Sequence, residues 1–106
     1  MNWMSFLTAA SLAALAGVSH ADAEAGKSRA QMACAVCHGQ QGLSALPNAP
    51  HLAGQPKIYL VEQMRNYRSG KRQHEVMSVI AKTLTDDDIQ KLSDWYASLN
   101  ISVQEK

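Results

Sequence analysis

Two cysteines and a histidine stand within five residues of this chain, in the order Cys34-Ala35-Val36-Cys37-His38. The pattern C-x-x-C-H is typical of covalent c-type haem attachment. Two thiols three residues apart on a helical turn can each bond to one of the two vinyl groups along one side of a porphyrin. The adjacent His38 is then held under the iron, where an imidazole nitrogen can bind it. The motif therefore predicts two thioether bonds and one axial ligand.

Two other kinds of site also use paired cysteines. A thioredoxin-like redox pair is expected beside a βαβ unit, and the sequence shows no such pattern. A zinc site needs about four ligands, and beyond Cys34 and Cys37 only scattered histidines remain to supply them. The sequence therefore favours a single covalently bound haem c over a dithiol or a zinc ion.

The second axial ligand must come from a later part of the chain or from an earlier methionine. The candidates are Met32, Met64, Met77, His51 and His74. Met32 and Met64 fall inside expected helices, and Met64 lies on an apolar stripe, where methionine usually fills a core. Met77 lies in an irregular stretch that is free to cross the far face of a haem. We expect Met77 to be the ligand, with His51 and His74 as the alternatives.

The first 21 residues differ from the rest of the chain. They contain no charged side chain, and an apolar run from Phe6 to Val18 is followed by small residues at Ser19 and Ala21. This pattern predicts a secretory signal peptide, residues 1–21, cleaved after Ala21 to leave a single domain, residues 22–106. An uncleaved anchor is the alternative, but the run is shorter than the roughly 18–20 residues that a spanning helix needs.

The domain is expected to be all-α. Helical patterns cover residues 22–37, 56–68 and 85–99, residues 76–84 can add a helical turn, and a loop rich in Gly and Pro spans residues 39–54. The strongest pattern begins at Thr85, a hydroxyl N-cap followed by three aspartates. Apolar residues then recur at helical spacing. No segment alternates with a period of two, so strands are not expected.

Few aromatic residues are available for the core of this domain. Trp95 and Tyr96 are expected to pack there, with Gly26 and Ala30 on the first helix offering a shallow surface to the indole ring. Ile58 extends the apolar stripe of the second helix, and both Ile58 and Tyr59 are expected in the core, with exposed members of an apolar interface patch as the alternative.

The formal net charge is only +1, from 10 Lys and Arg against 9 Asp and Glu, so charge gives no support to nucleic-acid binding. One local excess of positive charge does occur. This basic cluster consists of Arg65, Arg68, Lys71 and Arg72, and Asp86, Asp87 and Asp88 form an acidic counterpart. The basic cluster can be a docking surface for a partner or simply the solvated end of a helix.

The motif and several later segments together resemble the small class I cytochromes c of bacteria, above all one domain of the periplasmic two-haem cytochromes c. The likeness runs through Pro50-His51-Leu52-Ala53-Gly54-Gln55, Gly70-Lys71-Arg72 and Met77 to Trp95 and Tyr96. It implies that the first and last helices cross over a haem with His38 and Met77 as axial ligands. It also implies that the Pro50 carbonyl accepts a hydrogen bond from the other ring nitrogen of His38.

Two axial ligands leave no iron position for a substrate, so this reading predicts outer-sphere electron transfer and not an enzyme by itself. The expected function is a periplasmic one-electron carrier that contacts a membrane only through its redox partner proteins. One alternative is a haem c subunit that accepts electrons within a periplasmic dehydrogenase complex, for example in sulfur-compound oxidation. Another is a ligand-binding or peroxidatic haem protein with an open iron site.

Overall fold

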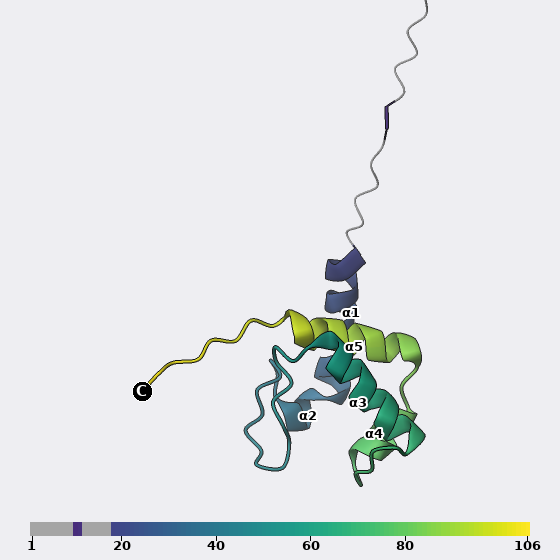
Figure 1. The fold of residues 1–106 in the computed structure, drawn as a ribbon, viewed down its shortest axis with the longest axis vertical. Helices are drawn as coiled ribbons and strands as arrows, with labels where there is room; N and C mark the ends of the chain where they lie inside the picture. Colours follow the sequence, from purple (N-terminus) through teal and green to yellow (C-terminus); the bar gives the residue numbers. More distant parts are fainter. Residues whose placement is uncertain (1–9, 12–17) are drawn as a thin grey trace, which may run out of the picture.

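The computed structural model describes residues 10, 11 and 18–106, and in these residues it consists of helices joined by loops (Figure 1). The helices are α1 (Val18–Ala33), α2 (Ala35–His38), α3 (Lys57–Ser69), α4 (Met77–Lys82) and α5 (Asp86–Ser98). No strand occurs in the described part of the chain, so the expected all-α class is confirmed.

The expected signal peptide lies largely outside the described residues. Within them, α1 begins at Val18 and continues through the Ala21–Asp22 bond at which cleavage was predicted. None of the described helices is both long enough and apolar enough to cross a membrane.

Helix α5 follows its sequence pattern closely. The Asp88 amide donates to Thr85 Oγ1 at 3.1 Å, and the Thr85 amide donates to Asp88 Oδ2 at 3.0 Å, which completes a capping box. The apolar stripe behind this cap is buried and comprises Ile89, Leu92, Trp95 and Tyr96. Both the N-terminal cap and the buried face of α5 are therefore those that its sequence predicts.

The cap of α5 predicts how stability responds to acid. The hydrogen bond from the Thr85 amide lowers the pKa of Asp88, and the hydrogen bond from Arg68 lowers the pKa of Asp86. A carboxyl group with a lowered pKa stabilises the fold above its unfolded pKa of about 4, and this contribution is lost as the pH falls through the folded pKa. We therefore expect the urea concentration at the unfolding midpoint, measured by circular dichroism, to decrease as the pH is lowered below about 4. The fall should be smaller in Asp88→Asn, and an equal fall in both proteins would contradict the assignment.

Helices α1 and α5 cross at Gly26. A Cβ atom at this position would lie 1.9 Å from the carbonyl oxygen of Lys91, in the middle of α5. Gly26 therefore lies directly against the backbone of α5, and only a residue without a side chain leaves room for this approach. Ala30, one turn later, is fully buried in the same core cluster as Trp95.

The buried stripe of α3 is narrower than the sequence predicted. Leu60, Val61 and Tyr67 are buried, but Ile58 is 80% exposed and Tyr59 is 45% exposed, so their assignment to the core is wrong. They lie in the first turn of the helix, and the apolar stripe begins only after them. The helix ends as expected, because Gly70 adopts the left-handed conformation (φ 88°) that closes a helix C-terminus.

The core is formed mainly by α1, α3 and α5. Its buried members are Ala30, Leu60, Val61, Leu84, Ile89, Leu92, Trp95 and Tyr96. The rings of Trp95 and Tyr96 lie 4.7 Å apart between centroids and are tilted by 57°, a favourable aromatic arrangement. The expected packing role of both aromatic residues is confirmed.

Candidate functional site

The C-x-x-C-H motif forms one helical turn directly after α1. The amides of Cys37 and His38 both donate to the carbonyl oxygen of Cys34, at 3.2 and 3.0 Å. The sequence predicted a continuous helix to Cys37, but the structure has a turn at Cys34 before α2 resumes at Ala35. Residues three apart on a helical turn are neighbours on one face. The two thiols are therefore presented by a single short element.

His38 is held by a hydrogen bond across the following loop. Its side chain is buried, and its Nδ1 atom lies 2.9 Å from the carbonyl oxygen of Pro50. A carbonyl can only accept, so Nδ1 carries the proton and donates it. In the neutral ring this leaves Nε2 as the nitrogen with a free lone pair. The contact is the one that the family resemblance implies for Pro50.

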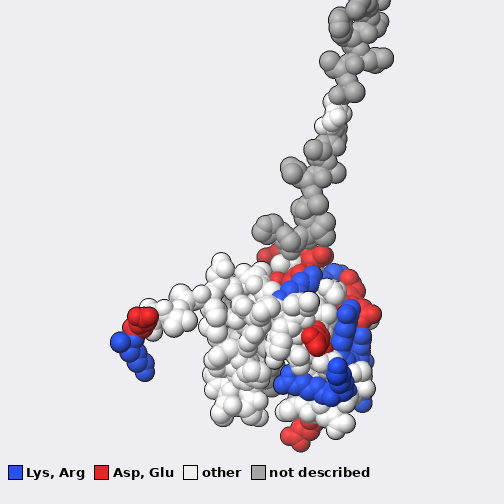
Figure 2. Space-filling view, in the orientation of Figure 1, with Lys and Arg blue, Asp and Glu red and all other residues white. Residues whose placement is uncertain are grey.

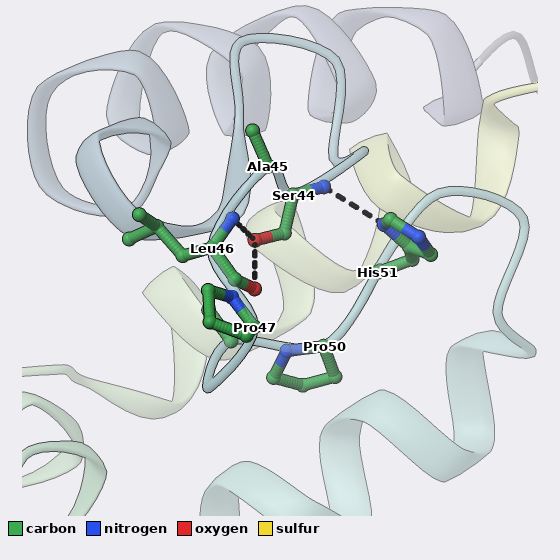
Figure 3. A pocket seen from close by; sticks show the side chains of 7 residues that line it. Ser44, Ala45, Leu46, Pro47, Pro50 and His51 are labelled. Carbon is green, nitrogen blue, oxygen red and sulfur yellow. Dashed lines mark hydrogen bonds between the residues drawn. The ribbon is translucent and has the colours of Figure 1, made fainter.

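Ser44 organises the loop that places Pro50. Its hydroxyl donates to the carbonyl of Cys37 at 2.9 Å, and also lies 3.2 Å from the carbonyl of Leu46. Its amide donates to Nδ1 of His51 at 2.8 Å (Figure 3). His51, an alternative ligand from the sequence, thus has one ring nitrogen engaged within the loop. Nothing in the sequence around Ser44 indicates which carbonyl its hydroxyl would reach.

Tyr96 fixes the same loop to α5. The Gly54 amide donates to the Tyr96 carbonyl at 2.9 Å. At Gly42, with φ 72°, a Cβ atom would lie 2.9 Å from both the Tyr96 ring and the Ala53 amide nitrogen. The ring therefore packs directly on the loop backbone, and only glycine leaves room for this approach.

Cys34 and Tyr96 meet at the inner end of the site. Burial raises the pKa of the Cys34 thiol, and burial also raises the pKa of Tyr96, with the neighbouring Cys34 contributing. The Tyr96 hydroxyl is buried and has no hydrogen-bond partner among the described residues. Desolvation therefore disfavours a charged thiolate at Cys34.

Met77 is the first residue of α4 and is half-buried. The sequence placed it in an irregular stretch and left open whether residues 76–84 add a helical turn. The structure has a short helix there. The other methionine candidates lie elsewhere: Met32 is 84% exposed on α1, and Met64 packs against the core from α3.

The alternative of a zinc site finds no support in the described part of the chain. No group of three or more His, Cys, Asp or Glu converges there, which argues against a zinc site at Cys34 and Cys37. Two open hollows of about 450 Å³ are present, one lined by loop residues 44–51 (Figure 3) and one by residues around His74. Neither hollow is lined by Cys34, Cys37 or Met77.

Comparison with known proteins agrees with this geometry. The family model described as Cytochrome c matches residues 23–100. The chain belongs to the cytochrome c family. A cytochrome c4 of Pseudomonas aeruginosa is 41% identical over 91 residues, which are 84% of this chain and 45% of that protein. Cytochrome c-554(548) of Halomonas halodenitrificans is 35% identical over 80 residues, 73% of this chain and 95% of that protein.

Solved structures share the fold. Reduced recombinant cytochrome c4 from Pseudomonas stutzeri has a TM-score of 0.72 at 28% identity, covering 76% of this chain and 50% of that one. Cytochrome c4 of Acidithiobacillus ferrooxidans has a TM-score of 0.71 at 33% identity, covering 79% of this chain and 53% of that one. The chain thus spans about half the length of the cytochromes c4 that it matches, and its fold is that of a class I cytochrome c.

The cofactor of this cytochrome domain is covalently bound haem c, and the residues present fit it. Two thiols lie on one turn, and the adjacent histidine has its Nδ1 proton engaged by Pro50. Large apolar side chains of the loop and of the α4 region, Leu43, Leu46, Val76 and Val79, are each at least 44% exposed. Such side chains suit contact with an apolar ring system better than contact with water.

Proposed function

We propose that this cytochrome domain is a one-electron carrier whose haem c is bonded to Cys34 and Cys37 and ligated by His38 and Met77. The observation that carries the proposal is the His38–Pro50 hydrogen bond, at 2.9 Å, beside two thiols on one helical turn. It fixes the imidazole tautomer and ring orientation, and it leaves Nε2 to bind the iron.

The haem, when bound, supplies an iron that cycles between the ferric and ferrous states. The chain's part would be to supply two side-chain ligands, so that no substrate coordinates. His38, held by Pro50, and Met77 would hold the iron, and a thioether is a ligand associated with raised haem potentials. A site closed in this way favours outer-sphere electron transfer over chemistry at the metal.

Electron transfer requires redox partner proteins, and the surface beside the motif offers a docking area. Residues 30–56 contain no Lys, Arg, Asp or Glu, and on the face shown in Figure 2 the charges of the helical body gather on one side, with a broad uncharged area on the other, beyond which only the C-terminal tail carries charge. Val36, between the two cysteines, is 91% exposed. We place partner docking on this uncharged area.

The basic cluster is a weaker docking candidate, because three of its members have partners in the same molecule. Arg65 and Arg68 both pair with Asp86, and Arg72 donates to Gln63 at 2.8 Å while lying over the Tyr67 ring. These contacts favour the structural interpretation of the cluster, as the solvated end of α3.

The proposed compartment is the periplasm. The pattern of residues 1–21 supports export and cleavage after Ala21, which leaves residues 22–106 as the haem domain. A covalently bound haem c accords with export, because bacterial haem attachment of this kind takes place outside the cytoplasm.

A second candidate is a haem c subunit that accepts electrons within a dehydrogenase complex. It is favoured by the similarity to a thiosulfate dehydrogenase electron acceptor of Stutzerimonas stutzeri, 33% identical over 69 residues, 62% of this chain and 32% of that protein. Size-exclusion chromatography of the native cell extract distinguishes the two, because a carrier elutes alone and a subunit elutes with its enzyme.

The proposal is tested on protein exported from cells that attach haem c. Haem staining should remain with the chain on a denaturing gel, and potentiometric titration should give a single one-electron wave. The ferrous protein should not bind carbon monoxide without denaturation. Carbon monoxide binding at neutral pH would show an open iron site and would contradict the two-ligand carrier.

A further inference from the structure

Several hydrogen bonds at the start of α4 converge on His74. Its carbonyl oxygen accepts from the Ser78 amide at 3.0 Å, which is a helical i to i+4 bond. Its Nδ1 atom accepts from the amides of Val76 at 3.1 Å and Met77 at 3.2 Å. Its own amide donates to the Ser78 hydroxyl at 3.0 Å. His74 and Ser78 therefore bracket the backbone of Met77 from both sides.

This arrangement does the work of a helix N-cap. An N-cap side chain accepts from amides of the first turn that have no partner within the helix, and a reciprocal bond returns to the capping residue in a capping box. Val76, the N-cap of α4 by position, supplies no such side-chain bond. The imidazole of His74 supplies it instead, from two residues earlier.

The cap matters because α4 is short. A helix of six residues has little stability of its own in water, and the segment that leads into it, residues 71–76, is exposed. The direction of the Met77 side chain follows from its backbone, because a side chain at the start of a helix points according to the helix axis. Whatever fixes the Met77 amide therefore also fixes the direction of the thioether.

We propose that His74 is a positioning residue for Met77, which it holds through two backbone hydrogen bonds so that the thioether stays on the iron. The inference rests on the proposed ligation by Met77 and extends it. The sequence presented His74 as a rival ligand, whereas the geometry makes it the support of Met77. Without the cap, Met77 should be held less firmly on the iron. The loss should show first in the ferric state, because a soft thioether binds ferric iron less firmly than ferrous iron.

The test is imidazole titration of the ferric holoprotein, followed by the far-red sulfur-to-iron absorption band, in four proteins. His74→Ala removes the acceptor, and imidazole should then displace Met77 at an about fivefold lower concentration, the size of effect that losing an N-cap has on a helix equilibrium. His74→Asn keeps an acceptor oxygen and should restore most of the native affinity. Gln73→Ala, the exposed neighbour, is the matched control and should match the native protein.

A further variant and a second readout guard against a general effect on folding. Ser78→Ala removes only the acceptor of the His74 amide, and it should shift the titration in the same direction as His74→Ala but by less. The midpoint potential of His74→Ala should be lower than that of the native protein, because weakening the thioether bond destabilises the ferrous state more than the ferric state. An unchanged potential would overturn the positioning role.

The outcomes separate this inference from the ligand assignment. Native imidazole affinity in His74→Ala, or a His74→Asn protein as weak as His74→Ala, would overturn the role of His74 alone. Persistence of the far-red band in Met77→Ala would instead overturn the ligation by Met77, and the role of His74 would fall with it.

Discussion

Alanine in place of Met77 is expected to remove the far-red sulfur-to-iron absorption band of the ferric protein and to lower its midpoint potential by on the order of 0.1 V or more, within the roughly 0.8 V range that axial ligands cover. The cause is the loss of the one thioether at the start of α4, which would leave His38 as the only axial side chain. The iron would then have an open position, so the ferrous variant should bind carbon monoxide. Optical spectroscopy and potentiometric titration measure all three effects.

The other methionines of the domain supply the controls for this result. Met32 is exposed on α1, so Met32→Ala should keep the band. Met64 packs against the core, so the volume-conserving Met64→Leu should keep the band at little cost in stability. A band that survives in Met77→Ala and disappears in one of these variants would move the ligand to another helix and would end the proposed site.

Much of the architecture was predictable because its causes are local. The cap and stripe of α5 need only residues 85–96, whose order states both where the helix begins and which side is apolar. The helical turn at Cys34–His38 is similarly contained within five residues. The end of α3 needed only Gly70. In each case the residues that determine the structure are adjacent in the chain, so spacing alone carries the information.

The contacts that build the site depend on atoms distant in sequence, and here spacing says little. The His38–Pro50 bond joins residues 12 apart, and it was expected only from family resemblance. The bond between Ser44 and His51 depends on how the loop folds back on itself, and sequence reasoning missed it. Both histidines that the sequence offered as rival ligands, His51 and His74, accept backbone amides in the structure.

The extent of burial along a helix was the remaining error. A periodic stripe shows that a helix has an apolar side, but the partner helix decides how many turns of that side are covered. Ile58 and Tyr59 lie beyond the covered part of α3. The sequence also did not show that Gly26 would meet a carbonyl of α5, because a residue without a side chain gives no indication of what approaches it.

The crossing at Gly26 yields the largest expected effect on stability. Gly26→Ala should destabilise the holoprotein by about 3 kcal/mol, at the upper end of the usual cost of overpacking a core. The sign is informative, because alanine is the better helix former by about 1 kcal/mol and would stabilise α1 if nothing faced this position. The obstacle is backbone: the Cβ atom would lie 1.9 Å from the Lys91 oxygen and 2.5 Å from its carbonyl carbon. Lys91 is in the middle of α5, where its carbonyl is committed to the helical hydrogen-bond ladder.

Relief of that contact requires α1 and α5 to move apart, and this would loosen Ala30 from the core that it shares with Trp95. Guanidinium unfolding of the holoprotein, followed by circular dichroism, measures the cost. Ser28→Ala, at an exposed position of the same helix, is the matched control and should leave the unfolding midpoint within about 0.5 kcal/mol of the native free energy. A Gly26→Ala protein as stable as the control would mean that the two helices do not touch at this point, and the packing that supports the Cys34 turn would need a different account.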